Sequence, residues 1–305
     1  MITNNYLNYI GSKDRYLPQI LDLLKEAQEK TGAQVLIDLF CGSAVVAMNA
    51  KDYFECTYCF DACEPLIQIH KWVQDATNSA ALVNEVESLI EAFGLSKDDK
   101  ENFLKLRSTW NTLRTALGQY NPAMLFCLVM HSYNYSFHFN KRGEYNAPSG
   151  ATRSSFNSSL RKKLINWKDK LDTQPSLTFE ACDFKTVFED RWQYTTIADN
   201  FKSVFFVDPP YSASVSKHPY RNPALKWDED EDRALISYLD KVNEKGHIFV
   251  FTNVLVNNGI SNVILQNWVK DKGYRVLPVS IDYNNCSYQR RNEGTTEEVI
   301  ITNLN

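Results

Sequence analysis

The segment 204–211, with the sequence VFFVDPPY, places the strongest constraint on how this chain can fold. Its β-branched and aromatic run has the length and composition of a buried strand. Two consecutive prolines cannot continue that strand, because neither can donate to the hydrogen-bond ladder. Asp208 is therefore expected at the carboxyl end of a strand, at the edge where open α/β sheets bind ligands.

The chemistry expected at that edge indicates a planar substrate that carries an amino group. Asp208 supplies a carboxylate, Pro209 a carbonyl on a rigid backbone, and Tyr211 a flat ring, all close together in the chain. The alternative is an ordinary strand and turn with a surface tyrosine, and the segment by itself leaves both interpretations open.

A second strand-and-turn pattern covers residues 35–47, VLIDLFCGSAVVA. A buried strand containing Asp38 and Phe40 leads into a tight turn with Gly42 and Ser43, where glycine permits close approach of a ligand to the backbone. The G-x-G-x-x-G pattern of dinucleotide sites is absent, and an acid lies four residues before the glycine. This combination fits a ligand with sulfonium and amino-acid groups better than a pyrophosphate.

Two further short strands are predicted to end in acids. Residues 56–61 end at Asp61, and an acid at the end of the second strand of a βαβ unit can bind ribose hydroxyls. Glu64 is the alternative for that role. Residues 177–184 end at Asp183 and Phe184, a pair that can hydrogen-bond to a purine and cover its ring.

A Gly11-Ser12-Lys13 turn precedes a helix whose apolar residues recur with helical spacing between 17 and 24. The free backbone N–H groups at a helix start, together with a lysine, can hold an anion. A surface loop is the alternative, because Gly-Ser is common in loops.

Helical patterns between residues 66 and 174 interrupt the α/β alternation, which indicates an inserted domain. We therefore expect a catalytic α/β domain made of residues 1–65 and 175–305, with a mostly helical insert at 66–174. The final two strands, within 274–303, are joined by a loop that contains Arg290 and Arg291.

The insert contains a predicted β-hairpin at 137–150, where aromatic and polar residues alternate around Lys-Arg-Gly. A basic helix at 153–171 follows it. Residues 131–170 hold eight basic and two acidic residues, although the whole chain has a formal charge of −4. A two-stranded ribbon fits the major groove of DNA, so the region favours DNA binding. A solvated helix face is the alternative for the basic helix.

In the order of these motifs, the chain resembles the Dam-type DNA adenine-N(6) methyltransferases, in which the target-recognition insert precedes DPPY. NYIGSK, DLFCGSAVV, the acids after the second and third strands, FNKRGEYNAPSG and the terminal EVIITN correspond to motifs of that family. The resemblance covers nearly all 305 residues. It implies a Rossmann-like methyltransferase fold, a doubly wound mixed sheet with an antiparallel C-terminal hairpin.

The chain departs from the family pattern at three positions. Ala44 replaces the second glycine of the cofactor turn, and Ser12 replaces a glycine of the N-terminal motif. His138 replaces the arginine that helps read GATC in relatives. The target sequence, GATC-like or other, is therefore left open.

The resemblance implies S-adenosylmethionine as the methyl donor and a flipped adenine in duplex DNA as the acceptor. Its implied cofactor residues are Tyr9, Gly11, Ser12, Lys13, Asp38, Phe40, Gly42, Ser43, Asp61, Asp183, Phe184 and Asp208. The implied catalytic residues are Asp208, Pro209 and Tyr211. The implied DNA-binding residues are His138, Asn140, Lys141, Arg142, Arg153, Arg161, Lys162 and Lys163.

Other features of the sequence bear on compartment, cysteine oxidation state and metal binding. The sequence contains no apolar run of membrane-spanning length and no signal peptide, which favours the cytoplasm. An odd number of cysteines, seven, indicates reduced thiols. Cys56, Cys59 and Cys63 have metal-like spacing, but no further pair completes four ligands, so no metal is expected.

Several functions remain to be distinguished. The chain is expected to act as a monomer, either as an orphan enzyme or with a cognate restriction endonuclease. A catalytically silent DNA-binding module and an amino-methyltransferase acting on another base are the alternatives. The polar segment 212–226 is expected to form a lid.

Overall fold

The computed structural model describes residues 2–9, 11, 13–187, 201–211, 227–257, 259–279 and 296–305. Ser12, the predicted lid at 212–226 and the loop with Arg290 and Arg291 lie outside these residues. Within the described residues, no helix is both long and apolar enough to span a membrane.

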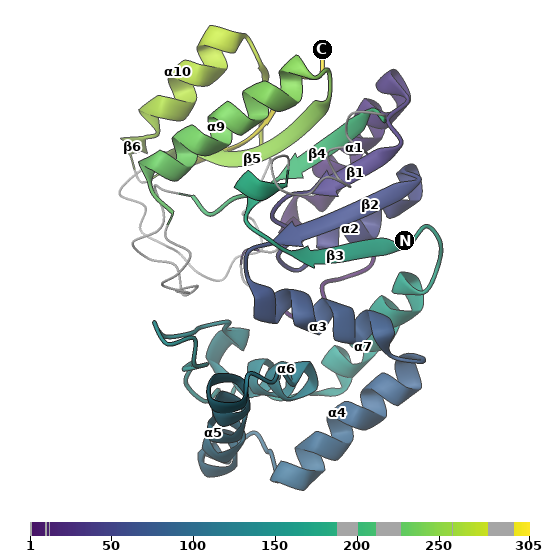
Figure 1. Ribbon diagram of the computed structural model, residues 1–305, viewed down its shortest axis with the longest axis vertical. Coiled ribbons are helices and arrows are strands. Elements are labelled where there is room, and N and C mark those ends of the chain that lie inside the picture. Colours follow the sequence, from purple (N-terminus) through teal and green to yellow (C-terminus); the bar gives the residue numbers. More distant parts are fainter. Residues whose placement is uncertain are drawn as a thin grey trace.

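A single mixed sheet of eight strands forms the centre of the molecule (Figure 1), with the order β3-β2-β1-β4-β5-β8-β7 and with β6 paired to β5. The strands are β1 (Val35–Asp38), β2 (Cys56–Asp61), β3 (Leu177–Ala181), β4 (Ser203–Val207), β5 (Ile248–Asn257), β6 (Ile260–Ser261), β7 (Arg275–Pro278) and β8 (Glu297–Thr302). The first five strands in this order are parallel, whereas β8 is antiparallel to both β5 and β7. This topology confirms the predicted doubly wound fold with an antiparallel C-terminal hairpin.

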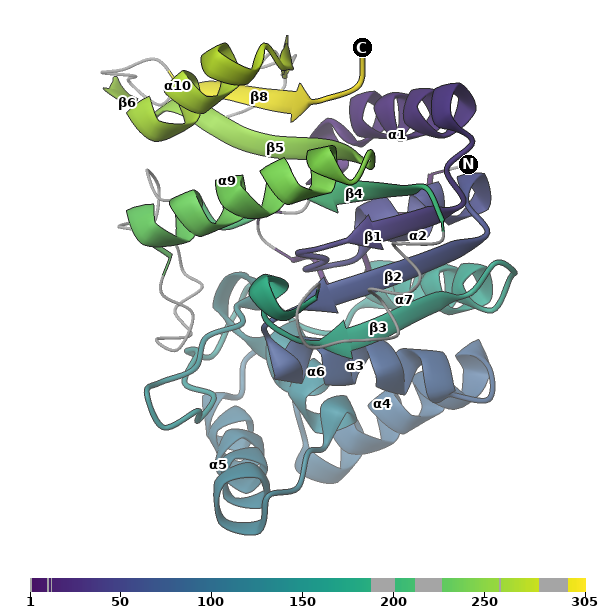
Figure 2. The ribbon, with the colours of Figure 1, turned by 45° about the horizontal axis from the view of Figure 1, so that its top comes forward.

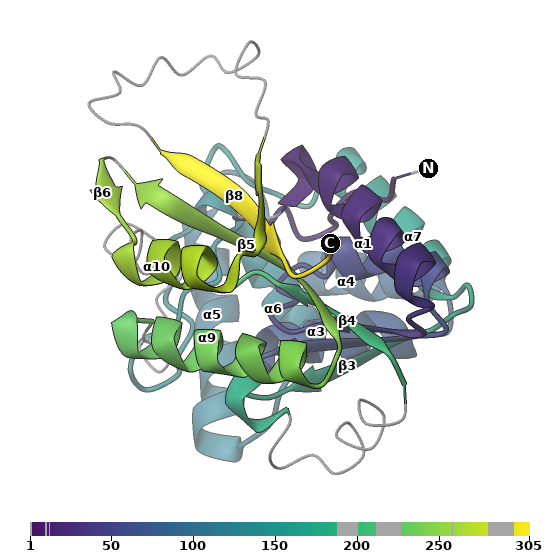
Figure 3. The same cartoon turned by 90° about the horizontal axis from the view of Figure 1, so that it is seen from above.

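Helices cover both faces of this sheet. Helices α1 (Leu17–Thr31), α2 (Val45–Ala50) and α3 (Glu64–Asp75) pack on one face, and α9 (Glu229–Glu244) and α10 (Val263–Lys272) pack on the other. Figure 3 shows α1 and the pair α9 and α10 on opposite sides of the sheet. The predicted strand β4 shows why both faces need a cover. Val204 and Phe206 point into one apolar cluster and Phe205 and Val207 into the other, and all four are buried.

Three helices lie beyond the β3 edge of the sheet (Figure 2): α4 (Ser79–Phe93), α5 (Lys100–Leu117) and α6 (Pro122–His131). Helix α7 (Ser158–Leu171) packs against α3 and α4. Helix α6 is buried along nearly its whole length between α3, α4 and α5. One apolar cluster joins these helices to α1–α3. The division of the chain at residue 66 stays a prediction; it falls inside α3, which packs against β2 and β3.

Candidate active site

Asp208 lies at the point where the strand order reverses. Strands β1 and β4 are parallel neighbours whose following connections run to opposite sides of the sheet, and open α/β sheets bind ligands at the carboxyl ends of such strands. Asp38 is the last residue of β1, and Asp208 directly follows β4. Two strands predicted to end in acids therefore bring those acids to one edge.

Each oxygen of the Asp208 carboxylate has its own partners. The Thr252 hydroxyl donates to Oδ1 at 2.7 Å, and the Tyr211 hydroxyl donates to the same oxygen at 3.0 Å. The Lys13 ammonium lies 2.7 Å from Oδ2, and the two side chains are only 9% and 15% exposed. Pro209 is buried directly beside them. The carboxylate is thus held in one orientation by Thr252 of β5, by Tyr211 after β4 and by Lys13 of the N-terminal turn.

Lys13 belongs to this buried cluster rather than to the solvated surface. Burial lowers its pKa, but the Asp208 carboxylate and Tyr16 outweigh burial, so the pKa of Lys13 is raised and the ammonium stays charged. Its Nζ lies 5.2 Å from the centre of the Tyr211 ring and 5.8 Å from that of Tyr16. Burial and the charge of Asp208 raise the pKa of the Tyr211 hydroxyl, which therefore remains a donor.

The predicted cofactor turn is fixed by side chains on three sides. Gly42 has φ +48°, and a Cβ there would lie 3.2 Å from the Tyr9 ring. The Gly42 N–H donates to Asp61 Oδ2 at 3.0 Å, and the Cys63 N–H donates to Asp61 Oδ1 at 2.8 Å. His70 Nε2 lies 2.8 Å from the Gly42 carbonyl oxygen. Asp61 therefore supports the turn and keeps lone pairs for a ligand.

Asp38 provides the test of whether this site suits a cationic ligand. Its side chain is buried, and Oδ1 has no hydrogen-bond donor among the described residues. Burial, followed by the charges of Asp208 and Asp61, raises the pKa of Asp38 well above its ordinary value, against the backbone N–H groups of Phe40 and Ala47. A ligand with ammonium or sulfonium groups would relieve this unfavourable burial of acids. The residues thus fit S-adenosylmethionine.

Aromatic rings form one wall beside the turn. The half-buried Phe40 ring lies 5.3 Å from Phe184 and 5.5 Å from Trp227. Phe184 is itself buried, so Phe40 is the more accessible face of this wall. Asp183 is exposed, and its carboxylate accepts a hydrogen bond from the Lys185 N–H at 2.9 Å.

Two other predicted cofactor residues lie in the same region. Ser43 is buried within the turn, and the Gly11 carbonyl oxygen lies 3.4 Å from Lys13 Nζ. Glu64, the alternative ribose ligand, instead accepts a hydrogen bond from the Tyr120 hydroxyl at 2.6 Å.

Sequence reasoning missed Thr252 and His70. Thr252 lies in β5, whose pairing with β4 aligns Phe251 with Val207 and so places Thr252 next to Asp208. A polar residue near the end of a buried run was the available signal. His70 lies in the middle of α3 and gave no such signal, because its partners Tyr6 and Gly42 are far away in sequence.

The predicted recognition hairpin forms with a short ladder. Phe139 and Tyr145 make an isolated antiparallel bridge, and the Asn146 N–H donates to the His138 carbonyl at 3.0 Å. The His138 imidazole contacts the side-chain oxygen of Asn146. His138 is therefore engaged with the returning strand of its own hairpin.

Asn140 builds the turn at the hairpin tip. Its side-chain oxygen accepts the N–H groups of Arg142 and Glu144 at 2.9 and 3.0 Å, and its amide donates to the Glu144 carboxylate at 2.6 Å. This geometry leaves the neighbouring side chains of Lys141 and Arg142 exposed at the tip. Asn140 thus has a structural task in addition to its predicted contact with bases.

The basic residues after the hairpin differ in their surroundings. Arg161 forms an ion pair of 3.0 Å with Glu87, and Lys163 donates to the Asn8 side chain at 2.6 Å. Lys162 is exposed on α7, and Arg153 is exposed with its guanidinium 5.6 Å from the Tyr133 ring. Contacts of Arg161 and Lys163 with phosphates would therefore require their present bonds to be shared or exchanged.

The cysteines of β2 do not converge on one point. Cys56 and Cys59 are three residues apart in a strand, so their side chains point to opposite faces. Within the described residues, no group of three or more His, Cys, Asp or Glu side chains is arranged to hold a metal ion.

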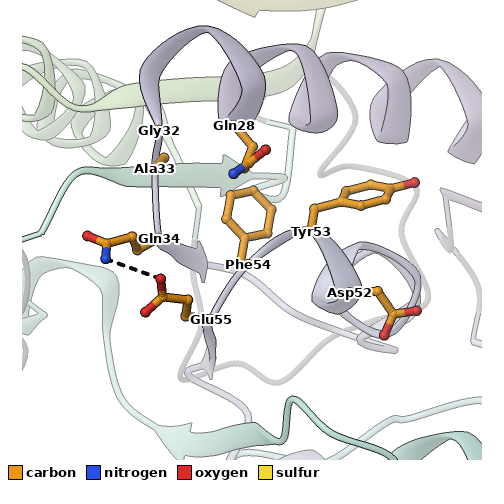
Figure 4. A pocket seen from close by; sticks show the side chains of 8 residues that line it. All are labelled: Gln28, Gly32, Ala33, Gln34, Asp52, Tyr53, Phe54 and Glu55. Atoms are coloured by element: carbon orange, nitrogen blue, oxygen red, sulfur yellow. Dashed lines mark hydrogen bonds between the residues drawn. The ribbon is translucent and has the colours of Figure 1, made fainter.

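A pocket of about 460 Å³ lies at the opposite edge of the sheet (Figure 4), lined by Gln28, Gly32, Ala33, Gln34, Asp52, Tyr53, Phe54 and Glu55. These residues precede β1 and β2, and the Gln34 amide donates to Glu55 at 3.2 Å. None of the predicted site residues lines this pocket, so its size does not make it the candidate site.

Comparison with known proteins agrees with this geometry. The family model described as D12 class N6 adenine-specific DNA methyltransferase matches residues 9–283. The chain is 30% identical over 299 residues to the modification methylase StsI of Streptococcus sanguinis, covering 97% of this chain and 42% of that protein. It is 29% identical over 306 residues to the type II methyltransferase M.FokI of Planomicrobium okeanokoites, covering 99% and 43%.

The modification methylase LlaI of Lactococcus lactis subsp. lactis is 25% identical over 302 residues, covering 98% of this chain and 43% of that protein. The chain therefore spans less than half the length of these three relatives. Among solved structures, the rRNA methyltransferase aviRa from Streptomyces viridochromogenes overlaps 95% of this chain and 88% of its own with 12% identity and a TM-score of 0.38, too low to inform the site.

Proposed function

Because the chain belongs to the D12 class N6 adenine-specific DNA methyltransferases, we propose that it transfers a methyl group from S-adenosylmethionine to the 6-amino group of an adenine in duplex DNA. The observation that carries this proposal is the Asp208 carboxylate at the topological switch point. Thr252 and Tyr211 fix its Oδ1, and Oδ2 faces the Lys13 ammonium.

This arrangement suits the nucleophile. The lone pair of an adenine amino group is delocalised into the ring, so the nitrogen attacks poorly unless its N–H groups are bound out of the ring plane. Asp208 Oδ2 and the Pro209 carbonyl would each accept one N–H, while the Tyr211 ring stacks on the base. Positioning and charge stabilisation then supply the catalysis, and Asp208 need not act as a strong base.

The cofactor supplies a methyl group that its sulfonium already activates for in-line displacement. Asp38 would hold its cationic amino-acid portion, Gly42 would admit it against the backbone, and Asp61 would accept a ribose hydroxyl. The half-buried Phe40 ring would cover part of it. Among the residues that the structure describes, Asp38 Oδ1 has no hydrogen-bond donor, which supports this assignment because a buried acid needs a donor.

DNA would approach the exposed tip of the hairpin. Lys141 and Arg142 would reach base edges, since arginine bonds bidentately to guanine, and Arg153 and Lys162 would contact phosphates. Extrusion of the adenine from the duplex would cost a few kcal/mol. Because three relatives are named modification or type II enzymes, we further propose that the chain is partnered with a restriction endonuclease. We also propose that it acts as a monomer in the cytoplasm.

The decisive experiment combines labelled S-adenosylmethionine with duplex DNA and a sequencing map of modified adenines. The wild-type chain should label DNA at a defined sequence, and calorimetry should detect S-adenosylmethionine binding. Asp208→Asn, which keeps the size of the side chain, and Asp208→Ala should both abolish transfer while sparing DNA binding. Full activity of either variant would overturn the assigned mechanism, and labelling of cytosine would overturn the assigned base.

A further inference from the structure

Helix α5 holds the returning strand of the hairpin along one face. Three side chains on that face donate to three alternate backbone carbonyls of the hairpin: Arg107 to Ala147 at 3.1 Å, Asn111 to Tyr145 at 3.0 Å, and Arg114 to Gly143. The spacing of the donors is i, i+4 and i+7, which is one face of a helix. The spacing of the acceptors is i, i+2 and i+4, which is one edge of a strand.

These side chains make the hydrogen bonds that a neighbouring strand would make. Among the described residues, Phe139–Tyr145 and Ser132–Ser149 are isolated bridges, and no strand of the sheet pairs with residues 143–147 of the hairpin. Asn111 both donates to the Tyr145 carbonyl and accepts the Tyr145 N–H at 2.8 Å, as a backbone peptide group would. The position of the hairpin therefore depends on side chains of α5.

Arg114 fixes the end of this ladder next to the tip. Its guanidinium lies 5.4, 5.3 and 5.3 Å from the ring centres of Trp110, Tyr120 and Phe139. A Cβ at Gly143 would lie 3.2 Å from the same guanidinium, and Gly143 has φ +76°. The basic tip thus sits at a defined distance from α5.

The same arginine connects the hairpin to the cofactor side of the molecule. Tyr120, which stacks beneath Arg114, donates through its hydroxyl to Glu64 at 2.6 Å. Glu64 is the first residue of α3, directly after the Cys63 N–H that binds Asp61. The hairpin is therefore positioned relative to the predicted catalytic edge, not only relative to α5.

We propose that Arg107, Asn111 and Arg114 are positioning residues that determine which DNA sequence is methylated, without touching DNA. The inference rests on the proposed function, because it assigns the choice of adenine to the hairpin. All three are half-buried, and each donates a hydrogen bond to a backbone carbonyl of the hairpin. They would act by setting where Lys141 and Arg142 meet the base edges.

The test uses Asn111→Leu, which removes both bonds to Tyr145 at similar volume, and Arg114→Met, which removes the charge and keeps an apolar stem. The matched control is Lys105→Met, because Lys105 is 61% exposed on α5 and pairs with Glu101 away from the hairpin. The ratio of kcat/KM at the preferred site to that at single-base variants should fall about tenfold or more in both variants, as one lost base contact would cause. The kcat at saturating DNA and the S-adenosylmethionine Kd should stay within about threefold, and the control should match wild type.

A second measurement separates this inference from the proposed function. Amide hydrogen exchange in the free protein should show a protected Tyr145 N–H in wild type and in Lys105→Met, and exchange at least about tenfold faster in Asn111→Leu. Unchanged exchange at Tyr145, or unchanged selectivity in a variant whose hairpin has loosened, would refute the positioning role. A wild-type chain that methylates no DNA would refute the proposed function instead, and the exchange result would still decide whether α5 holds the hairpin.

Discussion

Protonation of His70 should destabilise the folded chain and loosen the cofactor turn. The imidazole is 1% exposed and lies between two partners, the Tyr6 hydroxyl at 3.0 Å from Nδ1 and the Gly42 carbonyl at 2.8 Å from Nε2. The neutral tautomer with hydrogen on Nε2 satisfies both contacts. The ring also stacks on Phe179 at 4.8 Å. Burial lowers the pKa of His70 to about 4, against the opposing effect of the Gly42 carbonyl.

The loss of unfolding free energy follows from the lowered pKa of His70. In the unfolded chain the histidine would titrate near its ordinary value of 6.5, whereas in the folded chain it stays neutral down to about 4. One step in pKa corresponds to about 1.4 kcal/mol, so the full effect is about 3 kcal/mol. This part of the free energy of unfolding is fully present above pH 6.5 and is lost as pH falls towards 4. Between pH 7 and pH 5 the loss should be about 2 kcal/mol.

The assay is urea unfolding of wild type and His70→Gln at pH 7 and pH 5, because glutamine can retain the donor to Gly42. Other acids titrate in both proteins, so the informative quantity is the difference between them. The stability advantage of wild type should shrink by about 2 kcal/mol at the lower pH. His138→Gln, at a half-buried position in the hairpin, is the matched control. An advantage that is the same at both pH values would show that His70 is not held neutral by burial.

Three further outcomes are expected. Thr252→Val should lower kcat about 10- to 100-fold by removing one hydrogen bond to the charged Asp208, and Thr252→Ser should restore it; equal rates for both variants would contradict the assignment. S-adenosylmethionine binding should release protons, because the pKa of Asp38 is raised and a bound cation favours its ionised form. The affinity for S-adenosylmethionine should therefore rise with pH. Asp38→Asn should abolish the proton release, which calorimetry measures in buffers of different ionisation enthalpy. Arg142→Ala should change or relax the methylated sequence, and an unchanged methylation map would place recognition elsewhere.

The sheet could be predicted from the sequence because its signals are local. The run VFFV ends at DPPY within eight residues, and the turn at Gly42 follows VLID directly. The direction of each strand then puts Asp38 and Asp208 at one edge without further information. The same reasoning located the hairpin tip, where Lys141 and Arg142 are exposed as expected from their position in a polar turn.

The partners of those residues could not be predicted, because they come from distant parts of the chain. Thr252 meets Asp208 across 44 positions and His70 meets Tyr6 across 64. Composition was also a poor guide to the basic helix, where positive charge alone does not distinguish a phosphate contact from an internal bond. Arg161 pairs with Glu87 across 74 positions, and only the packing of α7 against α4 brings them together.

In the proposed function, different elements of the fold would carry out catalysis and choose the target. Asp208 is oriented by Thr252 of β5 and by Lys13, which lies just before α1. The hairpin is held by α5, and the Tyr120–Glu64 bond relates α5 to the start of α3. Substitutions along α5 can therefore move the hairpin while the carboxylate keeps its geometry. Because His138 contacts Asn146 of the same hairpin, we expect its replacement of the usual family arginine to affect the choice of DNA sequence rather than the groups around Asp208. On this proposal, substitutions in α5 or in the hairpin should change the methylated sequence without loss of methyl transfer.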